Sequence, residues 1–275
     1  MGMSSRMGVF QTPSGYGLRY LWEGNGTPVL FLHGFTGTHE SFATSVASLS
    51  ATFSCVAVDM IGHGKSDAPP EVEKYRMESV VEDLYALMVT LEFPHFSCVG
   101  YSMGGRTALA LAVAHPEAVS RLVLESASPG IVDERDRHKR RQSDERLASE
   151  IETLGIASFV KRWEQNPLFS TQSTDIVVQE RSIRLSQRGH GLARSLRGMG
   201  TGAQEELWTS LEQLRMPVLL ITGGLDEKFT SINKAMDQKI HDSRHVVFAN
   251  KGHNVHAESP ISYNKVLSDF LCDNG

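Results

Sequence analysis

Residues 96–115 read FSCVGYSMGGRTALALAVAH, and this stretch decides the fold. Phe96–Val99 is a short apolar run, typical of a buried strand, and residues 105–115 are rich in alanine and leucine, typical of a helix. Between them lies Gly100-Tyr101-Ser102-Met103-Gly104, which fits the pattern G-x-S-x-G. A sharp turn of this kind between a strand and a helix exposes its serine, because the glycines leave room for the bend. The stretch therefore predicts a nucleophilic Ser102 rather than only a glycine-rich turn.

Apolar runs of the same kind lie on both sides of this unit. Each is a few residues long and is apolar on both faces, and they cover residues 29–32, 55–58, 122–124, 218–222 and 245–248. Runs of this type are typical of buried parallel strands. Residues 78–91 carry apolar side chains at a helical period of about 3.6 residues. The alternation of strands and helices predicts an α/β fold with a mostly parallel, doubly wound sheet.

Residues 133–208 interrupt this alternation. The segment is polar and charged, shows helical periodicity in patches and contains no apolar run of comparable quality. A helical insertion between two strands of a sheet is typical of a cap over a binding site. We therefore expect residues 1–132 to form the first part of the core, residues 133–208 the helical cap and residues 209–275 the second part of the core.

Two further residues complete a catalytic triad with Ser102. A serine nucleophile needs a base, and the base needs a group that orients it. Asp226 follows the run 218–222, and His253 follows the run 245–248, so the order along the chain is serine, acid, histidine. A carboxylate that caps a turn and a histidine in a surface loop are the simpler interpretations of these two residues. His256, three residues further on, competes with His253 for the role of base.

The segment His33-Gly34-Phe35 ends the run 29–32. A glycine at this point lets the backbone turn a free N–H toward the nucleophile. We expect the backbone N–H groups of Phe35 and Met103 to form an oxyanion hole. For the side chain of His33 we expect a structural hydrogen bond below the loop.

The composition excludes several classes of function. The chain has 40% hydrophobic and 21% charged residues, with 27 basic and 32 acidic side chains for a net charge of −5, which argues against binding to nucleic acid or acidic lipid. No apolar run approaches the length of about 18–20 residues that spans a bilayer. The N-terminus lacks the apolar core of a signal peptide, and the three cysteines form no CxxC pair, so we expect a cytoplasmic protein. The negative balance also argues against an anionic ligand.

Five motifs together carry a resemblance to a known fold family. HGFTG (33–37), DMIGHGKSD (59–67), GYSMGG (100–105), GGLDEKF (223–229) and KGHNVHAESP (251–260) resemble the α/β-hydrolase fold from about Val29 to the C-terminus. Serine rather than aspartate at position 102 argues against a dehalogenase or an epoxide hydrolase. The complete triad argues against a relative without catalytic activity.

The predicted cap narrows the resemblance. SASPG (126–130), RRQSDERLA (140–148), WEQNPLF (163–169), RLSQRGHGLARSLRGMGTGAQ (184–204) and Trp208 are similar to the 2-succinyl-6-hydroxy-2,4-cyclohexadiene-1-carboxylate synthase (MenH) family of menaquinone biosynthesis. Cap segments diverge most among α/β hydrolases, so a match there is more specific than the triad. The family's substrate is a small tricarboxylate, and arginine binds carboxylates in a bidentate manner.

The resemblance assigns candidate binding residues. By position, the substrate-carboxylate arginines match Arg106, Arg140 and Arg184, and the pocket residues match Tyr101 and Trp163. A shift by one residue would replace Arg140 by Arg141, and Arg188 is a weaker additional candidate. The simpler interpretation of each arginine is a cation on a solvent-facing helix.

The family's reaction is an elimination, in which the triad removes a ring proton and pyruvate leaves. The resemblance implies no metal and no organic cofactor, and no cluster of metal ligands is visible in the sequence. One alternative is a serine esterase, thioesterase or C–C bond hydrolase that acts through an acyl-enzyme on Ser102. Another alternative is a ligand-binding partner of a biosynthetic complex. The oligomeric state stays open.

Overall fold

The computed structural model describes residues 5–273. Its strands are β1 (Ser5–Gln11), β2 (Gly17–Glu23), β3 (Thr27–Leu32), β4 (Phe53–Val58), β5 (Phe96–Tyr101), β6 (Val119–Glu125), β7 (Val218–Gly223) and β8 (Ser243–Phe248). Its α-helices are α1 (Ala43–Leu49), α2 (Met77–Thr90), α3 (Met103–Ala114), α4 (Glu134–Trp163), α5 (Thr174–Leu185), α6 (Gly189–Met199), α7 (Glu227–Asp237), α8 (Val255–Glu258) and α9 (Pro260–Cys272). Short 3-10 helices cover His39–Phe42, Val72–Tyr75, Pro167–Phe169 and Leu211–Gln213.

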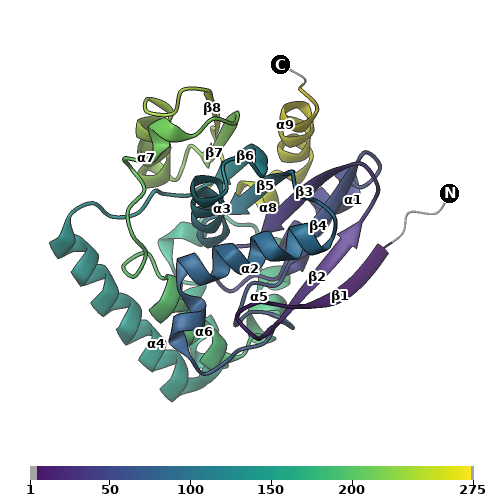
Figure 1. The fold of residues 1–275 in the computed structure, drawn as a ribbon. Helices are drawn as coiled ribbons and strands as arrows, with labels where there is room; N and C mark the ends of the chain where they lie inside the picture. Colours follow the sequence, from purple (N-terminus) through teal and green to yellow (C-terminus); the bar gives the residue numbers. More distant parts are fainter. Residues whose placement is uncertain (1–4, 274–275) are drawn as a thin grey trace.

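All described strands belong to one eight-stranded sheet with the order β1-β2-β4-β3-β5-β6-β7-β8. The pairings from β4 to β8 are parallel, whereas β1 pairs with β2, and β2 with β4, in antiparallel fashion. The expected α/β class and the mostly parallel sheet are confirmed. Figure 1 shows the sheet running through the molecule, with β1 and β2 at one edge and β8 at the other.

The central strands bury both of their faces because helices cover each side. Alternate residues of β3 belong to two different apolar clusters: Leu30 and Leu32 pack with α2 and α3, whereas Val29 and Phe31 pack with α1 and α9. This two-sided burial explains the continuous apolar runs in the sequence.

The structure differs from the sequence-based prediction at both edges of the sheet. The hairpin β1–β2 was not predicted, because β1 lies at the edge of the sheet and both strands are largely exposed or half-buried. Residues 245–248 do form a strand, but the prediction that it is buried on both faces is wrong. Val247 is 44% exposed, as befits a strand at the sheet edge.

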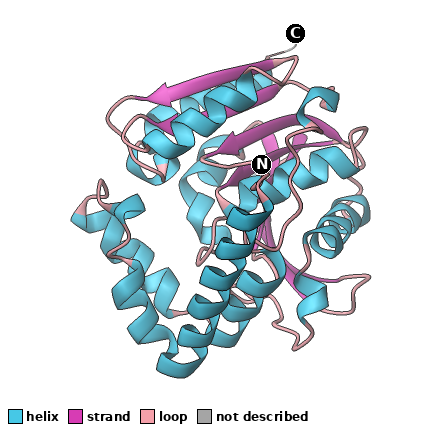
Figure 2. Cartoon of the chain, turned by 90° about the vertical axis from the view of Figure 1, so that its left-hand side faces the viewer, coloured by secondary structure: helices cyan, strands magenta, loops and turns pink. Residues whose placement is uncertain are grey.

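Three helices stand between β6 and β7, and we call α4, α5 and α6 the cap helices. They lie together below the sheet in the view of Figure 1, and the lower left of Figure 2 holds helices without strands. Helices α4 and α6 share a separate apolar cluster that includes Ile151, Phe159 and Leu192. Gly155 breaks the helical geometry of α4 with a φ of 77°. Within residues 5–273, no helix combines the length and apolar character needed to cross a membrane.

Candidate active site

Ser102 occupies a strained turn between β5 and α3. Its φ is 51° and its ψ is −106°, a conformation that costs a non-glycine residue about 1–3 kcal/mol. The turn needs small neighbours: a Cβ atom on Gly104 would lie 2.0 Å from the carbonyl oxygen of Leu32, and one on Gly100 would lie 2.3 Å from that of Gly104. The sequence folds this way because glycine alone fits at both positions, and the result is a serine held at the edge of the sheet.

The structure brings the three predicted triad residues together. His253 Nε2 lies 3.1 Å from Ser102 Oγ, and His253 Nδ1 lies 2.5 Å from Asp226 Oδ2. The other carboxylate oxygen of Asp226 accepts a hydrogen bond from the Phe229 N–H at 3.3 Å, and the Phe229 ring packs edge-on against His253. His253 and Asp226 are buried, so this chain of hydrogen bonds is shielded from bulk water. It has the connectivity of a serine, a base and an orienting acid.

The two residues expected to supply the oxyanion-hole amides both lie at the cavity. Phe35 follows β3 and Met103 begins α3, and both residues line the cavity beside Ser102. Within residues 5–273, neither N–H donates a hydrogen bond to another group. For Met103 this follows from its position, since the first N–H groups of a helix have no intrahelical acceptor. Both amides are therefore free to bind a negatively charged oxygen.

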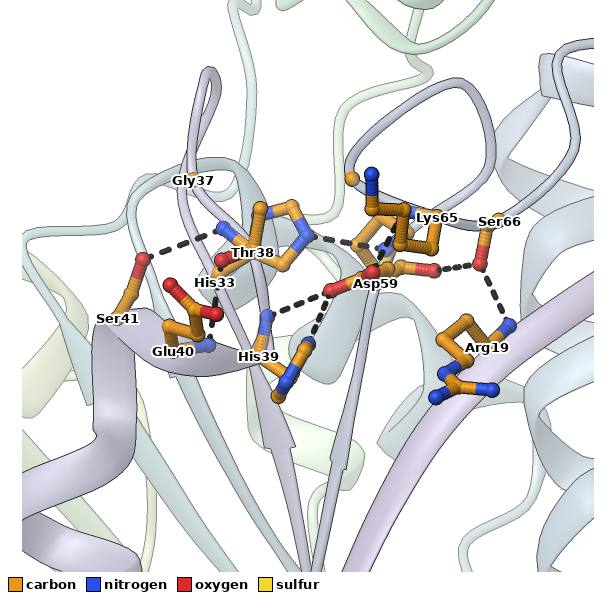
Figure 3. A network of polar contacts seen from close by, with 12 residues as sticks. Arg19, His33, Gly37, Thr38, His39, Glu40, Ser41, Asp59, Lys65 and Ser66 are labelled. Atoms are coloured by element: carbon orange, nitrogen blue, oxygen red, sulfur yellow. Dashed lines mark hydrogen bonds and ion pairs between the residues drawn. The ribbon is translucent and has the colours of Figure 1, made fainter. Parts of the chain in front are cut away.

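Buried histidine and aspartate side chains hold the loop that carries Phe35. His33 Nε2 accepts a hydrogen bond from the Met60 N–H at 2.9 Å, while its Nδ1 donates to the carbonyl oxygen of Gly34. Burial lowers the pKa of His33 to about 4, so the ring is neutral, as this arrangement requires. In Figure 3, Asp59 joins the same loop to the one after β4 by accepting hydrogen bonds from His39 and from the Lys65 N–H. His33 thus has the structural role expected from the sequence.

A cavity of about 750 Å³ lies between the carboxyl edge of the sheet and the cap helices. The five predicted binding residues all line it: Tyr101, Arg106, Arg140, Trp163 and Arg184. Ser102 and His253 line the same cavity. The nucleophile and the predicted binding residues therefore share one cavity.

Arg106 projects from α3, one turn after Ser102, and is 8% exposed. Its Nη1 donates to the carbonyl oxygen of Met199 at 2.9 Å and to the side-chain oxygen of Gln204. Burial, together with the nearby cation of Arg140, lowers the pKa of Arg106 to about 10, so the guanidinium remains charged at neutral pH. The partners on the cap side fix its orientation toward the cavity.

Arg140, rather than Arg141, faces the cavity. Arg140 lines the cavity and its Nε donates to Asp144 Oδ1 at 2.8 Å. Arg141 points elsewhere and donates to the carbonyl oxygen of Gly202 at 3.1 Å. The alternative left open by the sequence is thus decided by the direction of the two side chains on α4.

Arg184 is almost fully buried, with 2% of its surface exposed. Its guanidinium stacks on the ring of Phe169, 4.7 Å from the centroid, and lies 3.3 Å from Glu180 and 3.9 Å from Glu164. Two of its nitrogens, Nε and Nη1, have no hydrogen-bond partner among the described residues. A buried cation with unused donors at a cavity is well suited to bind an anionic ligand.

Arg188, the weaker additional candidate, does not line this cavity. Its guanidinium donates to the carbonyl oxygen of Ser66, on the loop after β4. Arg188 and Arg184 are four residues apart, but Arg188 lies beyond the end of α5, so helical spacing does not relate the two.

Trp163, at the end of α4, belongs to an aromatic group that includes Phe35, Phe159 and Phe169. Its indole Nε1 is buried and has no hydrogen-bond partner among residues 5–273. The group joins the cap helices to the loop that carries the Phe35 amide. Trp163 therefore offers both an apolar surface and an unused donor at the cavity.

Sequence reasoning missed three basic side chains of the cavity: Arg146, Arg162 and Lys228. In the sequence they resemble ordinary surface cations. Only the position of Lys228, two residues after Asp226, could have indicated that a cation lies near the site. His256, the competing base, is tied to Glu125 and has no contact with Ser102. Within the described part of the chain, no group of three or more histidine, cysteine or acidic side chains is arranged to hold a metal ion.

Comparison with known proteins agrees with this site. A family model described as the alpha/beta hydrolase fold matches residues 27–260. A Bacillus subtilis protein provisionally named 2-succinyl-6-hydroxy-2,4-cyclohexadiene-1-carboxylate synthase is 39% identical over 96% of this chain and 99% of its own length. The enzyme of that name from Salmonella paratyphi C is 31% identical over 90% of this chain and 94% of its own length.

A solved structure, that of MenH from S. aureus, superposes with a TM-score of 0.88 at 31% identity and covers 92% of this chain and 97% of that one. The match extends over the cap helices, where α/β hydrolases differ most, as well as over the sheet. The chain therefore belongs to the α/β-hydrolase fold superfamily and, within it, to the 2-succinyl-6-hydroxy-2,4-cyclohexadiene-1-carboxylate synthase (MenH) family.

Proposed function

We propose that this chain is a carbon–oxygen lyase of menaquinone biosynthesis. It eliminates pyruvate from 2-succinyl-5-enolpyruvyl-6-hydroxy-3-cyclohexene-1-carboxylate to give 2-succinyl-6-hydroxy-2,4-cyclohexadiene-1-carboxylate. One observation carries the proposal: a single cavity holds the hydrogen-bonded Ser102–His253 pair together with the buried cations Arg106 and Arg184. The relatives at 31–39% identity that bear the name of this enzyme support the same reaction.

The charge of the cavity supports a small tricarboxylate as the substrate. Six lysine or arginine side chains and three acidic side chains line the cavity, although the whole chain has a net charge of −5. The local excess of three positive charges matches three carboxylates. The expectation that the negative net charge of the chain disfavours an anionic ligand is wrong, because net charge describes the whole surface and not one site.

We assign the binding roles by the direction of the side chains. Arg184 offers two unused donors, Arg106 is fixed by its cap-side hydrogen bonds, and Arg140 approaches from α4. Each guanidinium can bind a carboxylate in a bidentate manner. Tyr101 and Trp163 supply the ring-sized surface against which the cyclohexene lies. In this proposal residues 133–208 form the cap, and residues 1–132 and 209–275 form the core.

The proposed chemistry begins with a proton transfer. His253 takes the hydroxyl proton of Ser102, and Ser102 Oγ removes the proton from the ring carbon that bears the succinyl group. Asp226 holds the imidazole in orientation and stabilises its positive form. The electron pair of the broken C–H bond forms a double bond to the succinyl carbonyl carbon, and negative charge collects on the carbonyl oxygen.

The N–H groups of Phe35 and Met103 stabilise that oxyanion. The carbonyl then re-forms, the electron pair makes a ring double bond between C2 and C3, the existing double bond shifts from C3–C4 to C4–C5, and the C5–O bond to the enolpyruvyl group breaks. Pyruvate leaves as its enolate, which takes the proton from His253. The steps are proton transfers and one C–O cleavage, so the residues named here account for all of them. No acyl-enzyme forms on Ser102.

We also propose that the enzyme works in the cytoplasm. Cys55, Cys98 and Cys272 are free thiols in the structure. Burial raises the pKa of the Cys55 thiol to about 12, so this group behaves as a small apolar side chain. Unpaired cysteines of this kind are typical of proteins in a reducing compartment.

The proposal is tested by following two products in parallel. The purified protein is mixed with the enolpyruvyl substrate, and pyruvate is measured with lactate dehydrogenase and NADH. An activated ester such as p-nitrophenyl acetate is tested separately for a burst of nitrophenol. We expect catalytic release of pyruvate and no stoichiometric burst. A burst equal to the enzyme concentration, without pyruvate release, would instead identify a hydrolase that uses an acyl-enzyme.

A further inference from the structure

Gln187 connects the cap to the loop that carries the Phe35 amide. It lies between α5 and α6 and is 4% exposed. Its side-chain Nε2 donates to the carbonyl oxygens of Thr36 and Gly37, both at 3.1 Å. Its Oε1 accepts a hydrogen bond from the Gly64 N–H at 2.9 Å. The amide thus joins the loops after β3 and β4, and its orientation is fixed because its donors and its acceptor each face a matching partner.

The hydrogen bonds that Gln187 donates reach the carbonyl oxygens of a strained turn. The Gly37 N–H donates to the Gly34 carbonyl and closes a four-residue turn in which Thr36 has a φ of 72°. This third position of the turn ordinarily takes glycine, because a Cβ atom disfavours a positive φ. Among residues 5–273, Gln187 is the only donor to the carbonyl oxygens of Thr36 and Gly37. Phe35, which lines the cavity, is the second residue of this turn.

Close to Gln187, the cap is attached to the loop after β4 by several contacts. Arg188 donates to the Ser66 carbonyl, and Arg194 on α6 donates to the Ala68 carbonyl at 3.0 Å. Gly191 crosses Gly62 so closely that a Cβ atom on Gly191 would lie 2.1 Å from the Gly62 carbonyl oxygen. The start of α6 is therefore held in place against the loop after β4. The backbone of Gln187, just before α6, is held in place with it.

On the core side, Asp59 holds the residue His39 and not the Gly34–Gly37 turn itself (Figure 3). Asp59 binds the N–H and the imidazole of His39, just after the turn. No contact of Asp59 reaches Thr36 or Gly37 in the described chain. The strained half of the turn thus depends on a side chain from the cap.

We propose that Gln187 is a positioning residue for the oxyanion hole: its carboxamide holds the Gly34–Gly37 turn in the conformation that presents the Phe35 N–H to the substrate. This inference rests on the proposed function, because it assumes that the Phe35 amide stabilises developing charge. It adds that a cap residue completes the oxyanion hole, so that the cap contributes to turnover as well as to binding.

The main test is Gln187→Met, which keeps the length and the unbranched shape of the side chain and removes all three hydrogen bonds. We expect kcat for pyruvate release to fall about 10- to 100-fold, less than or close to the loss of one oxyanion-hole donor. We expect KM to change by less than about twofold, because Arg106, Arg140 and Arg184 are untouched. Gln187→Glu, which keeps the acceptor and loses the donors, serves as the second variant if Gln187→Met does not fold. Gln179→Met, at an exposed position of α5, is the matched control and is expected to behave as the wild type.

A second measurement separates this inference from the proposed function. A fluorophosphonate reacts with an activated serine: the Ser102 O–P bond forms, the P–F bond breaks, and the same amides hold the charged phosphoryl oxygen. We expect Gln187→Met to lower the labelling rate by a factor similar to that for kcat. If the wild type labels but releases no pyruvate, the proposed lyase function is wrong, and the labelling rates still test Gln187. If kcat and the labelling rate of the folded variant equal those of the wild type, or if only KM changes, Gln187 does not position the oxyanion hole.

Discussion

His256 and Glu125 form a second histidine–carboxylate pair beside the triad, with His256 Nδ1 2.7 Å from Glu125 Oε2. The His256 N–H also donates to Glu125 Oε1 at 3.0 Å, and both side chains are buried. This pair ties helix α8 to the end of β6, whereas His253 reaches Ser102. The two histidines are three residues apart and have different tasks, one in stability and one in the proposed chemistry.

The first prediction separates these two histidines. His256→Ala leaves the Glu125 carboxylate buried without its main partner, and we expect a loss of about 3 kcal/mol in the free energy of unfolding. His253→Ala removes the base, and we expect kcat of the folded variant to fall about 10²- to 10⁴-fold. Urea unfolding and pyruvate release measure the two effects. The assignment is wrong if His256→Ala unfolds like the wild type and loses activity to the same extent as His253→Ala.

The second prediction concerns pH and the pair His39–Asp59. The hydrogen bond to Asp59 raises the pKa of His39 above its ordinary value of about 6.5, despite the opposing effect of burial. A raised pKa in the folded state means that the pair contributes its full stability below about pH 6.5 and loses it as the pH rises through the folded-state pKa. We therefore expect wild type and His39→Gln to differ more in stability at pH 6 than at pH 9.

Urea unfolding at these two pH values checks this expectation, with His241→Gln, at an exposed position, as the control. A difference between wild type and His39→Gln that grows from pH 6 to pH 9 would have the opposite sign to the one predicted. Because His39 lies just after the Gly34–Gly37 turn, kcat is measured over the same range.

The third prediction tests Arg184. Arg184→Met removes a buried cation from the cavity, a change that costs roughly 2–5 kcal/mol for a buried charge pair and thus raises KM about 30-fold or more. Arg184→Lys keeps the charge but loses the planar fork, and we expect an intermediate KM. Arg181→Met on the same helix is the control, since Arg181 is exposed and binds Glu164 instead. An unchanged KM in Arg184→Met would exclude Arg184 from substrate binding.

The fourth prediction compares two adjacent arginines of α4. Arg140→Ala removes a cation that lines the cavity, and we expect KM to rise about tenfold. Arg141→Ala removes a hydrogen bond to Gly202, and we expect a loss of about 1 kcal/mol in stability without a change in KM. Steady-state kinetics and thermal unfolding of both variants decide the matter. The reverse pattern would mean that Arg141 is the substrate ligand.

The parts of the fold that could be predicted from the sequence are the strands that are buried on both faces. Strands such as β4 are continuous apolar runs because helices cover both sides, and the turn around Ser102 is specified by its glycines. Ser102 and Asp226 each follow such a strand and His253 follows the edge strand β8, so their meeting at one edge of the sheet could be inferred. The β1–β2 hairpin was not predicted because neither strand is a continuous apolar run: β1 lies at the edge, and most of β2 is only half-buried.

The cap was harder to predict from the sequence. Arg184 and Arg188 have the same residue type and similar neighbours, but one is buried in the cavity and the other binds a core carbonyl. Which way a polar side chain of the cap points depends on how the cap helices pack, and the periodicity of a polar segment carries little of that information. Gln187 gave no signal for the same reason, since its partners are backbone groups far away in the sequence.

The most direct test of the central claim compares pyruvate release by the wild type and by Ser102→Ala from the enolpyruvyl substrate. Cyclohexadiene product is measured in the same samples, and binding of that product to Ser102→Ala confirms an intact cavity. We predict that the wild type forms pyruvate and cyclohexadiene in equal amounts and that Ser102→Ala lowers kcat about 10²- to 10⁴-fold. Equal rates for the two proteins, or no pyruvate from the wild type, would contradict the account.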